Sequence, residues 1–225
     1  MTDAEFRALA ERAAERYRSS GKYAWHFARG KLRGDPFFRY AVGQIPLLEP
    51  RSVLDLGCGQ GLLFACLAEA PERPKANTIV FHGIELQGRR VDIARRALGD
   101  IAVIGCGDIR TAEFPRSDLI VVVDVLLYLT AAEQDRVLER CVRALEPGGT
   151  LLLREADASA GLRFRITEWA ERALCAARGE PGQKLHYRGK REWCTALGGL
   201  GLAVTMQPMS EGTPFSNVLY VATKA

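Results

Sequence analysis

The spacing of hydrophobic positions changes near residue 51. Before that point, residues 3–18 carry apolar side chains three and four positions apart, and residues 19–50 are rich in aromatic and basic side chains with Gly and Pro at intervals. Apolar side chains at this spacing fall on one face of a helix. The pattern predicts an amphipathic helix over residues 3–18 and two short helices over 19–50. We expect residues 1–50 to form a helical N-terminal cap outside the main sheet.

From Arg51 onward, short apolar runs alternate with amphipathic stretches. Runs such as LIVVV suit parallel strands that are covered on both faces. Regular alternation of strands and helices predicts an α/β fold, a doubly wound and mostly parallel sheet. The predicted strands are 52–56, 78–84, 101–104, 117–124 and 150–155, and the predicted helices are about 61–70, 87–98 and 131–145.

The alternation breaks after the fifth strand. Residues 156–189 are polar and Arg-rich, and a helical stretch at 190–201 follows them. Two strand-like runs, 202–209 and 217–225, then complete a seven-stranded sheet with a hairpin-like connection. We therefore expect one domain over 51–225, in which 156–189 is an insertion in the substrate region.

Composition and net charge argue against several classes of protein. The chain has 225 residues and a formal net charge of +4, which is too small and too dispersed an excess for a nucleic-acid footprint. Its six cysteines show no CxxC spacing, so we expect neither a zinc site nor any other metal centre. The sequence shows no signal peptide and no run long enough for a membrane span. These features predict a reduced, cytoplasmic protein.

The stretch VLDLGCGQG, residues 53–61, is a strand followed by three glycines, with Asp55 near the strand's end. A dinucleotide site wants G-x-G-x-x-G, whereas here position 62 is Leu. Asp55 would also repel a diphosphate. The loop suits a ligand that carries cationic or hydroxyl groups.

These residues resemble the first motif of class I S-adenosylmethionine-dependent methyltransferases. Later elements are similar in order: Glu85 ends the second strand, Asp108 follows the third, Asp124 ends the fourth and PGG precedes the fifth. The resemblance implies a Rossmann-like methyltransferase fold that uses S-adenosylmethionine and releases S-adenosylhomocysteine. The cofactor-binding residues it implies are Asp55, Gly57, Cys58, Gly59, Glu85, Leu86, Gly107, Asp108, Ile109, Asp124 and Val125.

In the family, Asp55 would lie near the cofactor's ammonium group, directly or through water. Glu85 would bind the ribose hydroxyls and Asp108 the adenine amine. Ile109 and Leu86 would lie against the ring faces. A further candidate from the cap, Arg29 (or its neighbour Lys31), could hold the cofactor carboxylate.

Few residues qualify as catalytic groups. Tyr128, four residues after Asp124, and His26, within the aromatic cap, are the candidates. His186 with Tyr187, and the acids Glu155 and Asp157, could line the acceptor pocket. Each of these side chains also has an ordinary packing or surface role as an alternative.

The acceptor is predicted less directly. The fourth strand is not followed by an NPPY-like motif, which weakens methylation of nucleic-acid bases. The segments HFARGKLRGDPFFR and MSEGTPFSNVLYVATK resemble small bacterial methyltransferases found with aryl-polyene and xanthomonadin-like pigment genes. That resemblance implies a small aromatic or phenolic acceptor, free or on an acyl carrier protein, that is methylated at oxygen or carbon.

Two alternatives stay open. A chain with this fold can bind the cofactor without turnover and act as a binding or regulatory module. A nicotinamide-dependent oxidoreductase is the other, and the glycine spacing disfavours it. The oligomeric state is not predicted.

Overall fold

The computed structural model describes residues 1–70 and 79–225, so the first residue of the predicted strand 78–84 lies outside the described residues. The chain divides into two compact units, Met1–Asp118 and Leu119–Ala225. The predicted boundary after residue 50 falls within the first unit and stays a prediction. Seven strands hydrogen-bond in the order β3-β2-β1-β4-β5-β7-β6. A seven-stranded sheet and a helical N-terminal region were both predicted, and both are confirmed.

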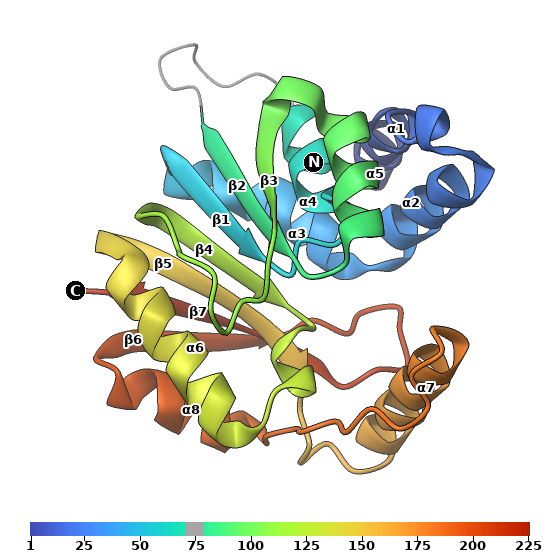
Figure 1. Cartoon of the computed structure of the whole chain (residues 1–225). Coiled ribbons are helices and arrows are strands. Elements are labelled where there is room, and N and C mark those ends of the chain that lie inside the picture. The colour runs from blue at the N-terminus through green and yellow to red at the C-terminus, as the bar shows by residue number, and fades with distance from the viewer. Residues whose placement is uncertain (71–78) are drawn as a thin grey trace. The chain divides into compact units, whose positions relative to one another are not determined.

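The first unit contains three parallel strands and the N-terminal helices (Figure 1). β1 pairs with β2, and β2 pairs with β3, so the carboxyl ends of all three lie at one edge. The strands are β1 (Ser52–Leu56), β2 (Val80–Glu85) and β3 (Ala102–Cys106). The helices are α1 (Asp3–Glu15), α2 (Lys22–Gly34), α3 (Pro36–Gln44), α4 (Leu62–Ala68) and α5 (Gly88–Leu98), with short 3-10 turns η1 (Arg18–Ser20), η2 (Ile45–Leu48) and η3 (Gly99–Ile101).

The N-terminal helices are joined to the glycine loop by a buried hydrogen bond. Tyr17, just after α1, is fully buried and donates its hydroxyl to the Gln60 carbonyl at 2.9 Å. Arg12 of α1 and Arg16, directly after it, both bind Glu69 at the end of α4. A capping box at Thr2 begins α1, and Asp35 caps α3 directly before Pro36. These contacts hold the N-terminal helices against the glycine loop and α4.

The second unit is mixed. β7 (Asn217–Lys224) is antiparallel to both β5 (Leu145–Ala156) and β6 (Leu202–Pro208), as the hairpin-like ending predicted. Its other elements are β4 (Ser117–Val123), η4 (Leu126–Tyr128), α6 (Ala131–Ala144), α7 (Leu162–Ala177) and α8 (Lys190–Gly199). α6 packs on β5, and α8 packs on β6 and β7. α7 comes from the predicted insertion and lies beyond the carboxyl end of β5 (Figure 1).

One local prediction was wrong. The PGG sequence at 147–149 was expected to separate helix and strand, whereas β5 begins at Leu145 and includes it. Gly148 has a φ of 75°, a conformation that glycine adopts without steric cost and that breaks the regular strand geometry locally. The predicted capping box at Thr130 and Glu133 is present and starts α6.

Gly83, in the middle of β2, is required by close packing. A Cβ there would lie 2.7 Å from Cys58 Sγ and 2.8 Å from Ile104 Cδ1. We predict that Gly83→Ala lowers the free energy of unfolding by about 1–3 kcal/mol, because the core must shift to admit a methyl group. Gly105→Ala on β3 is the control, since its Cβ would find its nearest neighbour at 3.7 Å. Urea denaturation measures both, and equal midpoints for the two variants would contradict the packing argument.

Candidate active site

The glycine loop after β1 turns sharply enough to need glycine at three positions. Gly57, Gly59 and Gly61 have φ values of 72°, 58° and 76°. A Cβ on Gly61 would lie 2.6 Å from Leu98 Cδ1, so this glycine lets α5 pack against the loop. A Cβ on Gly59 would meet nothing within 4 Å. Gly59 therefore borders open space, where a ligand can approach the main chain.

The amide groups of the loop are bound to the protein itself. The Ile84 carbonyl accepts hydrogen bonds from Gly57 N at 2.7 Å and Cys58 N at 3.1 Å. Gly59 N donates to Glu85 Oε2 at 2.9 Å, and Gly61 N donates to the Cys58 carbonyl at 2.9 Å. A diphosphate site needs free amides that point at the anion. These four amides are committed elsewhere, so the loop is poorly suited to a dinucleotide.

Two buried carboxylates lie beside the loop. Asp55 and Glu85 are 6% and 5% exposed. Burial, and secondarily the charge of Glu85, raises the pKa of Asp55 to about 7. Glu85 Oε1 also accepts a hydrogen bond from Gln87 N at 2.9 Å. Because ionising the buried Asp55 beside the Glu85 carboxylate is costly, this site favours a ligand that brings a positive charge and hydroxyl donors.

Asp108, the third acid predicted to contact a cofactor in this unit, follows β3. Its carboxylate accepts hydrogen bonds from the backbone amide of Arg110 at 2.9 Å and from the Arg110 guanidinium at 2.5 Å. These contacts lower the pKa of Asp108. Gly107 N donates to the Glu85 carbonyl at 3.0 Å, which ties the turn to β2. Ile109 is buried and Leu86 is exposed.

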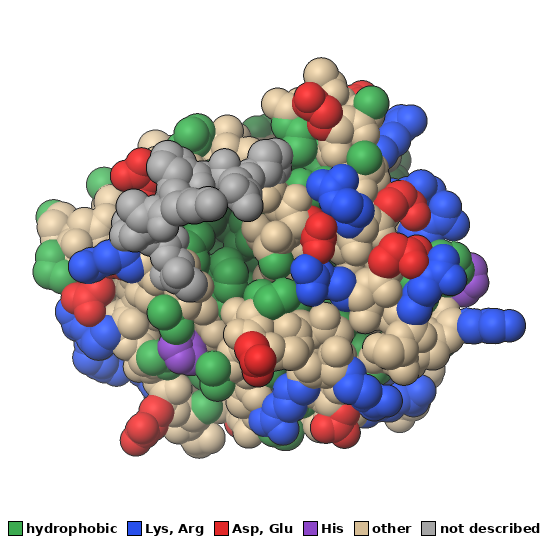
Figure 2. Space-filling view, turned by 90° about the horizontal axis from the view of Figure 1, so that it is seen from above, with side chains coloured by type: hydrophobic (Ala, Val, Ile, Leu, Met, Phe, Trp, Pro, Cys, Tyr) green, Lys and Arg blue, Asp and Glu red, His purple; other side chains and the backbone are tan. Residues whose placement is uncertain are grey.

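The two candidates from the cap are placed on α2. Arg29 Nε lies 3.0 Å from both carboxylate oxygens of Glu11, and its guanidinium stacks on Trp25. His26 is exposed, with its ring 4.5 Å from that of Trp25. Figure 2 shows acidic and basic side chains interspersed over the region of these helices. The structure gives Arg29 a structural partner, and the predicted roles of both residues stay predictions.

Asp124 in the second unit has an unusual backbone. Its φ is 55°, in the left-handed region, which non-glycine residues adopt mostly where surrounding contacts enforce it. Arg154, only 1% exposed, provides such contacts: its guanidinium makes a two-pronged ion pair with the Asp124 carboxylate, and its carbonyl accepts Asp124 N at 3.0 Å. β5 therefore fixes the residue that directly follows β4.

Glu155, the next residue of β5, holds the segment that follows Asp124. Its Oε1 accepts hydrogen bonds from Val125 N at 3.1 Å and Leu126 N at 2.7 Å. The side chain is 1% exposed, and burial raises its pKa to about 8. Sequence reasoning named Glu155 as a possible acceptor contact but did not anticipate that it braces this loop.

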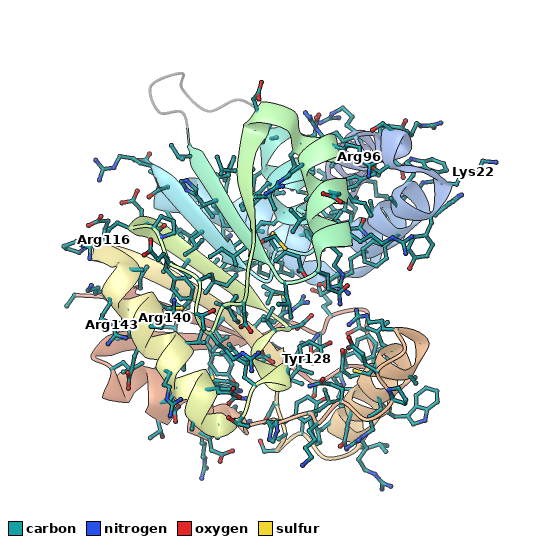
Figure 3. The ribbon with its side chains drawn as sticks, viewed as in Figure 1. Lys22, Arg96, Arg116, Tyr128, Arg140 and Arg143 are labelled. Atoms are coloured by element: carbon teal, nitrogen blue, oxygen red, sulfur yellow. The ribbon has the colours of Figure 1, made fainter. Side chains whose placement is uncertain are left out.

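Tyr128, at the end of η4, lies on the side of α7 (Figure 3). Its hydroxyl is hydrogen-bonded to the Glu171 carboxylate and accepts a hydrogen bond from Arg178 Nη1 at 3.1 Å. Burial and the neighbouring carboxylate raise the pKa of Tyr128. Sequence reasoning missed Glu171 and Arg178, because nothing in the pattern of residues 156–189 indicates which side chains return to η4.

Among the residues described, no group of three or more His, Cys, Asp or Glu side chains is arranged to hold a metal ion. In the same ranges, no helix is both long and apolar enough to cross a membrane.

Proteins of known structure have the same fold as this chain, and the central part of its sequence is similar to that of known proteins. An O-methyltransferase family protein from Burkholderia thailandensis superposes with a TM-score of 0.66 at 19% identity, over 92% of this chain and 62% of that one. Human N-acetylserotonin methyltransferase, solved with S-adenosylmethionine, superposes with a TM-score of 0.63 at 17% identity, over 98% of this chain and 59% of that one. The chain thus has the Rossmann-like fold of class I S-adenosylmethionine-dependent methyltransferases.

The sequence comparisons find similarity in the central part of the chain. Residues 53–149 match the family model described as methyltransferase domain. A carboxy-S-adenosyl-L-methionine synthase from Chromohalobacter salexigens is 31% identical over 135 residues, which is 55% of this chain and 48% of that protein. The chain spans less than half the length of the first curated relatives it matches.

The raised pKa of Asp55 leads to a stability prediction. An unfolded Asp ionises near 3.8, whereas folded Asp55 keeps its proton up to about pH 7. The group therefore removes stability as pH rises through this window. We predict that Asp55→Asn stabilises the ligand-free protein by about 4 kcal/mol more at pH 8 than at pH 4.

Urea denaturation across this pH range measures the effect. Asp100→Asn, at an exposed position where folding desolvates no carboxyl group, is the control. A pH-independent difference for Asp55→Asn would rule out the buried-acid interpretation.

Proposed function

We propose that this chain is a methyltransferase that binds S-adenosylmethionine at the glycine loop and acids of the first unit. The observation that carries the proposal is the combination of a loop in which four amides are already bonded with two buried carboxylates at its side. This combination disfavours a diphosphate and favours an ammonium group and hydroxyls. The methyltransferase family match over residues 53–149 supports it.

The residues present fit this cofactor. Asp55 would neutralise its ammonium group, and Glu85 would accept hydrogen bonds from its ribose hydroxyls. Asp108 would accept from the adenine amine, with Leu86 and Ile109 against the ring. The bound cofactor would supply a methyl group activated by its sulfonium, leaving S-adenosylhomocysteine as product.

The loop itself would meet the cofactor through its carbonyls and Cα faces at Gly57, Cys58 and Gly59, since its amides are used. In the second unit, Asp124 and Val125 are the residues proposed for the methionine side. Their braces, Arg154 and Glu155, keep this segment in one conformation before the ligand arrives. A site fixed in advance loses less free energy on binding.

For the acceptor, we propose a small aromatic or phenolic molecule, free or on a carrier protein, methylated at oxygen or carbon. Tyr23 and Phe27 of α2 support this class, because they form an exposed stacked pair, 73% and 41% exposed, with ring centroids 6.4 Å apart. Three further cap aromatics serve packing: Phe37 and Phe38 are buried, and arginines cover Trp25.

A binding module without turnover is the second candidate, because the loop and its buried acids report binding of a ligand and not turnover. Incubation with isotopically labelled S-adenosylmethionine and a panel of phenols separates the candidates. Label transfer supports the methyltransferase. Binding of S-adenosylhomocysteine with no transfer to any acceptor supports the module.

We predict that S-adenosylhomocysteine raises the melting temperature of the protein and that NAD does not. The physical reason is the charge of the site: two buried acids, beside a loop in which four amides are already bonded, repel a diphosphate and attract an ammonium group. A thermal-shift assay with the two ligands is decisive. Stabilisation by NAD alone would point instead to the oxidoreductase alternative.

A side chain at Gly59 should block the ligand. We predict that Gly59→Arg lowers the affinity for S-adenosylhomocysteine at least tenfold in calorimetry, because the new side chain enters the open space beside the loop. Asp108→Ala should lower it less, by roughly threefold, the value of one exposed hydrogen bond. Gly201→Arg is the matched control, with a positive φ of 80° and equally open surroundings. Wild-type affinity in Gly59→Arg would remove the ligand from this loop.

A further inference from the structure

The hydroxyl of Tyr128 takes part in two hydrogen bonds within the second unit. It donates its proton to the Glu171 carboxylate on α7, and it accepts a hydrogen bond from Arg178 Nη1 at 3.1 Å. A phenol oxygen has two acceptor positions, so one of them is left over. That position can accept a hydrogen bond from a hydroxyl group that enters the site.

A phenol in this setting is a poor base. Burial and the Glu171 carboxylate raise the pKa of Tyr128 far above neutrality, and Arg178 opposes this only in part. At neutral pH the hydroxyl therefore keeps its proton. If Tyr128 takes part in proton transfer, it must release one proton as it receives another, and Glu171 is the group in contact that can take it.

The surroundings of the pair come from three elements. α7 brings Glu171 and, past its end, Arg178, and η4 brings Tyr128 itself. The segment before α8 brings Tyr187, whose ring stands edge-on to Phe164 at 4.9 Å. The Tyr187 hydroxyl is buried and has no hydrogen-bond partner among the described residues.

The charged groups that act on Tyr187 are Glu171, Glu168, Glu155 and Arg172, whereas those that act on Tyr128 are Glu171 and Arg178. His186 adjoins η4 through its backbone amide, which donates to the Leu127 carbonyl at 2.7 Å. The cluster thus offers a carboxylate, an unsatisfied phenol and an aromatic edge, a combination that suits a ligand with a hydroxyl on an apolar body.

We propose that Tyr128 and Glu171 form a proton relay for the acceptor, in which Glu171 is the final proton acceptor and Arg178 positions the Tyr128 hydroxyl. The inference rests on the proposed methyl transfer, and it assigns Tyr128 the role of a conduit instead of a base. The acceptor is a molecule with a hydroxyl group.

The relay transfers two protons. The O–H bond of the acceptor breaks, and its proton forms a new O–H bond on Tyr128. The original Tyr128 proton passes to a Glu171 oxygen. The acceptor oxygen keeps the electron pair with which it takes up the methyl group, and Glu171 later returns its proton to solvent. Tyr128 ends the cycle unchanged.

The hydrogen bond can be tested without any acceptor. Tyrosine ionisation is followed near 295 nm, and subtracting the titration of Tyr128→Phe from that of the wild type isolates Tyr128. We expect no ionisation of Tyr128 below about pH 11, and a midpoint lower by at least one pH unit in Glu171→Gln, because the carboxylate that holds the proton is gone. Glu168→Gln, one turn earlier on α7, is the matched control and should leave the midpoint in place. An unchanged midpoint in Glu171→Gln would overturn the proposal.

The relay is tested on whichever phenol of the panel accepts label. Glu171→Gln and Tyr128→Phe should each lower kcat at least tenfold, leave the affinity for S-adenosylhomocysteine unchanged and remove the acidic limb of the pH–rate profile. Glu168→Gln should keep wild-type kcat. A wild-type rate in Glu171→Gln would overturn the relay while leaving the proposed function intact. Absence of S-adenosylhomocysteine binding in the wild type would instead overturn the proposed function, and the relay with it.

Discussion

The hydrogen bonds between the end of β2 and the glycine loop are the constraint on which the first unit's site depends. The Ile84 carbonyl and the Glu85 carboxylate together take the amides of Gly57, Cys58 and Gly59. At these three residues the loop consequently presents carbonyls and neighbouring acids to a ligand, not amides. A common strand–loop–helix arrangement is thereby changed from an anion site into a site that favours cations. Asp55 adds a carboxylate that stays half neutral until a positive charge arrives, since its pKa is about 7.

In the second unit, buried side chains of a neighbouring strand hold the backbone beside the site. Arg154 and Glu155, adjacent in β5, bind the carboxylate of Asp124 and the amides after it, and so support a left-handed backbone at that residue. α7 is joined to η4 by the Tyr128–Glu171 hydrogen bond. A buried hydrogen-bond network stabilises a structure only when each of its polar groups has a partner. Each hydrogen bond of the network therefore limits how the neighbouring groups can move.

Local signals in the sequence predicted most of the fold. The strand and glycine loop at 53–61 and the capping box at Thr130 depend on neighbouring residues, and both are present. The PGG sequence misled, because a glycine that turns a chain can equally sit within a strand such as β5. The partners Glu171 for Tyr128 and Glu11 for Arg29 were beyond prediction, since they are 43 and 18 positions away and no spacing rule joins them.

The central claim, that the loop and its acids form a site for an ammonium-bearing nucleoside, is tested most directly by calorimetry of S-adenosylhomocysteine binding as a function of pH. If Asp55 must ionise to hold the ammonium group, affinity rises at least tenfold from about pH 5.5 to about pH 7.5. Protons are then released on binding, which is seen as heats that differ between buffers of different ionisation enthalpy. Equal affinity across this range with no proton release would contradict the account.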